Sequence, residues 1–343
     1  MATKYLAKTF NYGLLIQANW ATPQLPGANY KTVAYNAGVT VFEPDAKVEM
    51  HNTSSQNGIH REFERIYVDG RSGLPKVNFS MPADVTTLAP HLGAALFGVT
   101  EGGASDYTKT IAALGLTGTI DFNGDDTEVY TIAMDNKASA DDGIVLENAI
   151  IENLELSWDF NANGTARLVQ VSGAWVGNEM NFEQTTDGTW TTTTFNPMGN
   201  TDLYSLSTLT SDAVDLSGMT VRGFTFNVAN NVTTNASTTA GKPNNYDVAP
   251  VYTSRILLDY NATTEKILKD FQDGATITAT IGSSLGSGNT GHLSLTCVNG
   301  ILQKQPFAYN GEFAAIELDV MWHSATAGTP VTAVITDAIN WGY

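Results

Sequence analysis

Residues that could form a hydrolase triad occur late in the chain. The run Gly282-Ser283-Ser284-Leu285-Gly286 fits the G-x-S-x-G pattern, and Asp319 and His323 follow in the serine, aspartate, histidine order of α/β-hydrolases. That chemistry needs a strand, a sharp turn and a helix to present the serine. Here a polar turn and another strand-like segment follow instead. The sequence therefore favours a flexible hairpin, and a hydrolase that uses Ser284 is kept only as a third alternative.

Two ligand-binding patterns also lack the context that their chemistry needs. Residues 286–291 spell G-x-G-x-x-G, but no helical pattern follows to present an amino terminus to a pyrophosphate. Asp121, Asn123 and Asp125 have the spacing that opens a calcium loop, but the sixth and twelfth positions are not the glycine and glutamate that the loop requires. We interpret the first pattern as a loop and the second as a hairpin turn.

Metal and thiol chemistry is not predicted either. Cys297 is the only cysteine, which excludes a disulfide framework within one chain and an all-thiolate metal site. His51, His60 and His91 are scattered, without the i, i+4 spacing of a zinc hydrolase. We expect no catalytic residue, no metal ligand and no cofactor, and hence a protein that is not an enzyme.

The chain is strongly acidic, and the acidity is concentrated. Its 343 residues carry 17 Lys plus Arg against 35 Asp plus Glu, a formal net charge of −18. Residues 99–160 hold 13 acidic and 2 basic residues, so −11 of that charge lies in one tract. Such a field repels phosphates, and no basic cluster offsets it, so binding of nucleic acid through counterion release is not expected.

Hydrophobic residues make up 42% of the chain, enough to bury a sizeable core. Neither a secretion signal nor an apolar run of about eighteen residues is present, so we expect a soluble, unexported polypeptide with no membrane partner.

The sequence predicts that the elements that position the candidate residues are mainly β-strands. Two-residue alternation and β-branched runs bounded by Gly, Asn and Asp predict strands. These strands are expected at residues 76–81, 118–122, 128–133, 150–160, 165–176, 219–228, 255–260, 276–281, 293–298 and 313–322. Helical spacing predicts helices at 83–97 and 261–272. Asn-Gly pairs at 123–124, 163–164 and 310–311 predict hairpin turns.

A repeat with an offset of 147 residues indicates an internal duplication. The identical pairs are Phe160 with Phe307, Asn163 with Asn310, Gly164 with Gly311, and Trp175 with Trp322. The order of strand and then helix repeats upstream of both hairpins. We therefore expect two tandem domains, at 1–185 and 186–343, and the first would carry an amino-terminal arm and an acidic insertion at about 99–146.

Alternation in residues 147–160 predicts a strand with one dry face and one wet, negative face. Glu147, Glu155 and Asp159 belong to the wet face. In the second copy Glu317 and Asp319 are on the wet face, and their partners at the same offset are Gln170 and Ser172. Taken alone, this pattern is also typical of a solvated outer sheet face.

The chain resembles the tail tube (major tail) proteins of long-tailed bacteriophages. The resemblance is carried by three segments: residues 68–79, which lead into the helix ending at Gly98; the hairpin at 150–173; and residues 218–224 with 255–260. It covers most of the chain as a pattern, without a single diagnostic motif.

The resemblance implies two tandem tail-tube-like β-sandwich domains, each with one flanking α-helix, that assemble into an inner β-barrel. It also implies rings of three chains with pseudo-sixfold symmetry, stacked into a hollow tube, which contact other tail proteins and let DNA pass without specific binding. The expected location is the virion tail, after assembly in the host cytoplasm.

The same resemblance suggests roles for individual residues. The lumen-lining candidates are Glu147, Glu155, Asp159, Gln170, Ser172, Glu317 and Asp319. The loop candidates for contact between rings are Asn52, Asn57, Asn231, Asn235 and Lys242. The alternative function is a carbohydrate-binding or adhesin-like β-sandwich, with Trp190, Tyr204 or Trp341 as sugar platforms.

Overall fold

The computed structural model describes 22 strands and one helix of the chain. The described residues are 10–17, 31–33, 41–43, 48–51, 64–67, 74–83, 88–104, 107–114, 129–136, 143–159, 169–184, 204–208, 221–234, 246–261, 264–265, 269, 273–274, 276–285, 292–303, 307–310, 313–324 and 328–337. Within them the fold is mainly β, as predicted, and every strand pairing is antiparallel.

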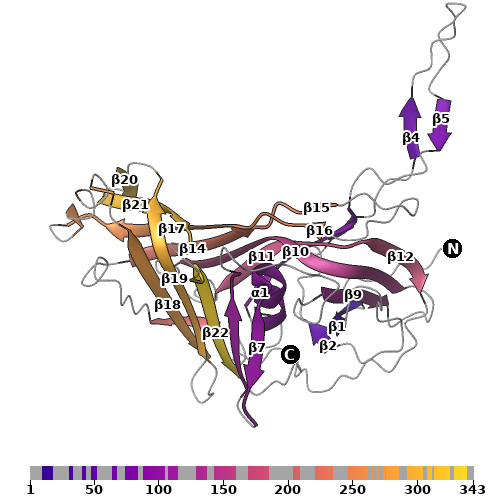
Figure 1. Cartoon of the computed structure of the whole chain (residues 1–343), viewed down its shortest axis with the longest axis horizontal. Coiled ribbons are helices and arrows are strands. Elements are labelled where there is room, and N and C mark those ends of the chain that lie inside the picture. The colour runs from indigo at the N-terminus through magenta and orange to yellow at the C-terminus, as the bar shows by residue number, and fades with distance from the viewer. Residues whose placement is uncertain are drawn as a thin grey trace, which may run out of the picture.

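A large sheet, here called the main sheet, crosses the molecule (Figure 1). Its order is β3 (Val41–Glu43), β6 (Lys76–Pro82), β11 (Gln170–Val176), the second part of β10 (Gly143–Asp159), β14 (Val221–Ala229), β17 (Val251–Asp259) and β21 (Phe313–Trp322). The far edge of β21 pairs with β20 (Phe307–Asn310) and with the end of β19 (His292–Leu302). β20 and β21 form the hairpin predicted from Asn310-Gly311.

Two further sheets branch from the main sheet. The first contains β2 (Lys31–Val33), β1 (Phe10–Gln17), β9 (Val129–Asn136), the first part of β10 and β12 (Glu179–Gln184). The second contains β13 (Tyr204–Thr208), β18 (Ile277–Leu285), the first part of β19, β22 (Val331–Asp337), β8 (Tyr107–Ala112) and β7 (Val99–Gly102). Small hairpins join β4 (Val48–His51) to β5 (Glu64–Tyr67) and β15 (Thr233–Thr234) to β16 (Tyr246–Asp247). Figure 1 shows β4 and β5 standing away from the other strands.

The strand β10 passes from one sheet to another through a bend at Asn148. This residue has a positive φ of 52°, which asparagine tolerates better than most residues. Gln17 fixes the bend from the neighbouring sheet: its Nε2 donates to Asn148 Oδ1 at 2.8 Å, and its Oε1 accepts from the Asn148 backbone N–H at 2.9 Å. Both residues are buried, so the turn in the strand is locked by paired polar groups rather than by solvent.

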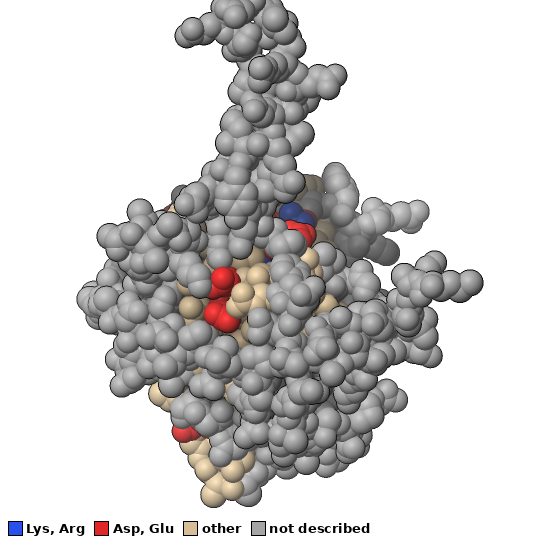
Figure 2. Space-filling model, turned by 90° about the vertical axis from the view of Figure 1, so that its right-hand side faces the viewer, with Lys and Arg blue, Asp and Glu red and all other residues tan. Residues whose placement is uncertain are grey.

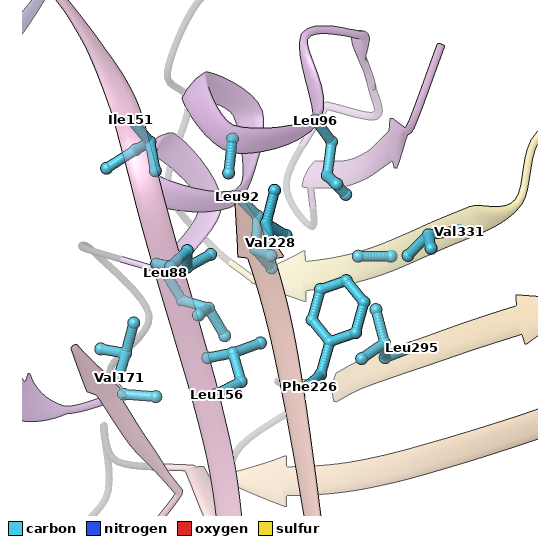
Figure 3. Packing of buried hydrophobic residues seen from close by; sticks show 14 of the residues in the cluster. Leu88, Leu92, Leu96, Ile151, Leu156, Val171, Phe226, Val228, Leu295 and Val331 are labelled. Carbon is cyan, nitrogen blue, oxygen red and sulfur yellow. The ribbon is translucent and has the colours of Figure 1, made fainter. Parts of the chain in front are cut away.

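The helix α1 (Leu88–Leu96) packs between the strands, within the predicted span 83–97. All nine of its residues are buried. Leu88, Leu92 and Leu96 face side chains of β10 and β14 such as Leu156 and Phe226 (Figure 3). Figure 3 also shows Leu295 of β19 beside Phe226, and Leu295 and Val331 of β22 belong to the same hydrophobic cluster as the helix. The helix therefore joins both halves of the chain in one core.

Of the second predicted helix, at 261–272, the structure describes only a few residues near its ends. Asn261 and Thr264 form a reciprocal cap: Asn261 Oδ1 accepts from the Thr264 N–H at 3.0 Å, and Thr264 Oγ1 accepts from the Asn261 N–H at 2.7 Å. Asp273 donates its N–H to Lys269 O at 3.0 Å, and Gly274 follows with a φ of 70°. These are the features of a helix start and a glycine-terminated helix end.

The structure shows no barrel within the described part of one chain. The strand pairings branch, but they do not return to their starting strand, so the main sheet is open. The buried residues of the two halves share one large hydrophobic cluster that runs from Tyr12 to Ile335. The predicted strand at 118–122 and the predicted turn at 163–164 lie outside the described residues.

Candidate functional site

The outward side of the main sheet, here called the polar face, gathers most of the predicted lumen residues. In each strand alternate side chains point into the core, and the intervening ones point outward. The outward residues are Glu43, Lys76, Asn78, Ser80, Gln170, Ser172, Asn153, Glu155, Ser157, Asp159, Gly223, Thr225, Asn227, Ala229, Val251, Thr253, Arg255, Leu257, Asp259, Glu317, Asp319 and Met321. None of them is buried.

The register of the strands sets these residues in rows across the sheet. Glu155 lies between Ser172 on β11 and Asn227 on β14. In the next row, Ser157 lies opposite Thr225 on β14, and Thr225 lies opposite Arg255 on β17. Arg255 in turn lies opposite Asp319 on β21. Hydroxyl and amide side chains therefore separate the acids of β10 from those of β21.

Acidic side chains outnumber basic ones on this face. Six of its residues are acidic, including Glu43 opposite Lys76, and two, Lys76 and Arg255, are basic. Arg255 lies near both acids of β21: its Nε is 3.3 Å from Glu317 Oε1 and 3.6 Å from Asp319 Oδ1. Lys76 contacts Glu152, with Nζ 2.6 Å from Oε2. On β10 the acidic residues of the face, Glu155 and Asp159, are exposed.

An ion pair at the end of the face holds β14 to β17. Arg222 donates Nε and Nη2 to the carboxylate of Asp259, with the shortest contact at 2.6 Å. The hydrogen bond to Asp259 raises the pKa of the Arg222 guanidinium.

On the side of the molecule shown in Figure 2, the described charged side chains are mostly acidic.

The structure brings six of the seven lumen candidates to this face. Glu155 and Asp159 lie on β10, Gln170 and Ser172 on β11, and Glu317 and Asp319 on β21. Glu147 lies elsewhere, because it precedes the bend of β10 and pairs with Glu179 of β12. Its carboxylate accepts from Asn181 Nδ2 at 2.8 Å.

Of the predicted loop residues for contact between rings, the structure describes Asn231 alone. Asn231 is exposed and has a φ of 46°. Its Nδ2 donates to Ala249 O at 2.9 Å, which closes the base of the segment 231–248. Tyr246, near the other end of that segment, donates its hydroxyl to Asn148 O at 2.9 Å and so ties the segment to the bend of β10. Asn52, Asn57, Asn235 and Lys242 lie outside the described residues.

The same set of strand pairings occurs twice in the chain. In the first half the pairs are β1–β9, β3–β6, β6–β11, β11–β10, β10–β9 and β10–β12. In the second half they are β13–β18, β14–β17, β17–β21, β21–β19, β19–β18 and β19–β22. Each half also has a positive-φ asparagine, Asn148 or Asn299, where its long strand passes between sheets.

Two features depart from that repetition. The strand β14 pairs with β17 and also with β10, so it joins the two halves of the main sheet. The hairpin of β7 and β8 pairs with β22, and the described part of the second half has no equivalent hairpin. This hairpin and β9 both fall in the tract 99–146, which thus supplies strands to two sheets.

The residues of the hydrolase pattern are not assembled as a triad would require. Ser284 lies in β18 opposite His292, at one end of β19, whereas β21 pairs with residues 300–302 at the other end. Eight residues of strand separate these ends, roughly 27 Å. Asp319 instead lies beside Arg255. Among the described residues, no group of three or more His, Cys, Asp or Glu side chains could hold a metal ion.

A buried charge cluster was not predicted from the sequence. Lys109 Nζ, with no exposed surface, lies 2.5 Å from Asp337 Oδ1 and 3.6 Å from Glu101 Oε1. The three residues come from β8, β22 and β7, so the cluster fastens the β7–β8 hairpin to the second half of the chain. No strand was predicted at Lys109, and no local pattern could show that its partner lies 228 residues away.

Comparisons with protein-family models and with curated protein sequences find no match for this chain. In the part of the chain that the structure describes, no helix is long and apolar enough to cross a membrane.

Proposed function

We propose that this chain is a structural subunit that assembles into the hollow tail tube of a long-tailed bacteriophage. The repeated set of six strand pairings carries the proposal, because it supplies two equivalent units from one chain, and both units contribute strands to the main sheet. We infer that these units are tandem domains with a boundary near residue 185, and that the sheet is completed into an inner barrel only in the assembly.

Three such chains in a ring would present six units, which gives the pseudo-sixfold symmetry of a closed cyclic assembly. Stacked rings would then form the tube, with other tail proteins at its ends. The open main sheet supports this arrangement, since a sheet with unpaired edges forms hydrogen bonds with further strands.

The polar face would line the bore. Its acidic residues outnumber its basic ones, and its other members are mostly small hydroxyl and amide residues. A lining of that kind repels the phosphates of DNA, so DNA would pass without being held. Glu155, Asp159, Glu317, Asp319, Gln170 and Ser172 are the lining residues of this proposal, and Arg255 reduces the charge of the β21 pair.

Negative-stain electron microscopy of the purified chain tests the proposal. The expected result is rings and hollow tubes whose number rises with protein concentration. A monodisperse monomer at every concentration, especially one that binds glycans on an array, would contradict it and would favour the carbohydrate-binding alternative. A catalytic activity that is lost in Ser284→Ala would favour the hydrolase alternative.

A further inference from the structure

One edge of the main sheet lacks a strand partner among the described residues. The chain runs along β21 twice on this side, first as residues 300–302 at the end of β19 and then as β20. Gly300 also lies opposite Ile277 of β18, but no described strand pairs with the opposite side of Ile301, Leu302 or β20, which are called the open edge below. Unpaired backbone groups on a sheet edge are a ready template for another strand.

The first half of the chain shows what occupies the equivalent position. There the second part of β10 runs along β11, as the open edge runs along β21. Its other side pairs with β14 over residues 153–159, with Leu154 opposite Val228. The equivalent of Leu154 is Leu302, because these residues lie opposite Gly173 and Val320, two residues before the final tryptophan of each strand.

Two aromatic residues at equivalent places of the two halves differ in exposure. In the first half Trp158 packs edge-on against Phe224 of β14, with ring centroids 5.6 Å apart, and is only 2% exposed. The register of β10 on β11 ends with Ser157 opposite Gln170, and one step further it places Trp158 opposite Val169. Val169 corresponds to Ile316 at the offset of 147 residues. Phe307 lies opposite Ile316, at the equivalent place on the open edge, and is 49% exposed.

Within one chain, β3 is the strand that corresponds to β14. Phe42 lies opposite Val77 on β6, and Val228 lies opposite Tyr252 on β17. Val77 and Tyr252 are equivalent because each lies opposite the final tryptophan of its half. Because β14 already links the two halves, β3 would fill the same position among the described strands by pairing with the open edge of another molecule.

We propose that β3 of a second copy of this chain pairs antiparallel with the open edge. The register of β14 on β10 transfers directly: Phe42 would lie opposite Leu302, and Glu43 would lie opposite Ile301. This junction deepens the proposed function, because it is head-to-tail and therefore closes into a ring or continues as an open chain.

The exposed apolar side chains fit this occupant. Among the described residues, the large hydrophobic side chains that are exposed are Tyr260, Ile301, Phe307 and Met321. Ile301 and Phe307 belong to the open edge itself, Met321 pairs with Ile301, and the ring of Tyr260 contacts Phe307 at 5.8 Å. A strand laid along the edge would remove part of this surface from water.

An engineered disulfide between copies tests the junction. In Glu43→Cys/Ile301→Cys, both substituted side chains are exposed, and they belong to opposite edges of the main sheet. Mild oxidation should give a ladder of covalent multimers that a reductant removes. The native Cys297 is fully buried, so it does not compete for the link.

The matched control is Glu43→Cys/Met321→Cys. Met321 is 38% exposed and pairs with Ile301, but it lies one strand further from the expected position of β3. That adds about 4.8 Å, which takes the pair beyond the reach of a disulfide. We expect at least about tenfold less covalent multimer from the control under the same oxidation.

Phe307→Glu provides an independent readout. Because Phe307 is half exposed, the thermal unfolding of the isolated subunit should be nearly unchanged, while assembly should require at least about tenfold more protein. Unchanged assembly by Phe307→Glu would contradict the junction.

The two proposals can fail separately. Rings that form without the Glu43–Ile301 link, or with equal linking in the control, overturn the junction and leave the tube subunit standing. Covalent chains that never close into rings or tubes support the junction and contradict the tube.

Discussion

Trp175 and Trp322, 147 residues apart, lie at equivalent positions near the ends of their strands, and each donates its buried indole N–H to an acceptor on a neighbouring element. Trp175 Nε1 donates to His91 Nε2 on α1 at 3.3 Å, and Trp322 Nε1 donates to Ser254 Oγ on β17 at 2.8 Å. The position is repeated, whereas the acceptor differs. A buried indole that keeps its polar atom paired stabilises each half of the sheet in its own way.

The pair formed by Trp322 and Ser254 is expected to be energetically coupled. Ser254→Ala leaves the indole N–H buried without an acceptor, which should lower the free energy of unfolding by about 1–3 kcal/mol. A double-mutant cycle with Trp322→Phe should give a coupling of about 1 kcal/mol in urea unfolding of the unassembled subunit. Additive effects of the two substitutions would show that the hydrogen bond does not contribute to stability.

The approach of Gly300 to Trp322 leaves no room for a side chain. A Cβ at Gly300 would overlap the indole ring of Trp322 and the side chain of Val320. We expect Gly300→Ala to lower the free energy of unfolding by about 1–3 kcal/mol, because the packed neighbours must move. Gly102→Ala is the control, since a Cβ there meets no atom within 4 Å. Equal melting temperatures of the two variants would contradict this packing.

The buried Lys109 is expected to be far more important for stability than the exposed Lys76. Lys109→Met leaves the carboxylates of Asp337 and Glu101 buried without their cation, so we expect a loss of about 3–5 kcal/mol. Lys76→Met removes a partly exposed contact with Glu152 and should change stability by less than about 1 kcal/mol. Chemical denaturation measures both, and similar losses would contradict the difference in burial.

Cys297 should make stability fall at alkaline pH. Burial raises the pKa of its thiol far above the ordinary value, so the folded thiol stays protonated. The unfolded thiol ionises above about pH 8.5, so the unfolded state binds fewer protons there and gains stability as the pH rises. From pH 9 to 10 this group should lower the free energy of unfolding by about 1.2 kcal/mol. In Cys297→Ala that part of the pH dependence should be absent, and parallel curves for the two proteins would refute the prediction.

Reversing the charge of the polar face should convert a passive lining into one that binds DNA. The change is to replace Glu155, Asp159, Glu317 and Asp319 by Lys. These side chains are not buried, so rings should still form, while DNA should bind at low salt and ejection should slow. Glutamine and asparagine replacements at the same positions are the neutral control. Unchanged infectivity of particles with the Lys variant would contradict the assignment of this face to the bore.

Local alternation predicted the strands that carry the polar face. The range 76–81 is observed as β6, and the range 313–322 coincides with β21. The wet positions of β10 were predicted correctly from Asn153 to Asp159, where an exposed face and a buried face alternate, whereas Ala149 and Ile151, at odd positions of the same alternation, are buried. The barrel expected for the assembly is not present in one chain, whose main sheet is open.

Features that depend on pairing between distant segments could not be read from the sequence. Glu147 follows the same alternation as Glu155, yet the bend at Asn148 sends it to another sheet, where it contacts Asn181. The contact of Arg255 with Glu317 and Asp319 depends on the register of β17 against β21. No local pattern encodes either of these relationships.

The number of chains in each ring is the most direct test of the central claim. Cryo-electron microscopy of the assembled protein should show a hollow tube whose rings hold three chains and whose inner wall has six similar units. That result follows from one chain that contributes two equivalent sets of strands. Rings of six chains, or an inner wall without sixfold-like repetition, would contradict the account.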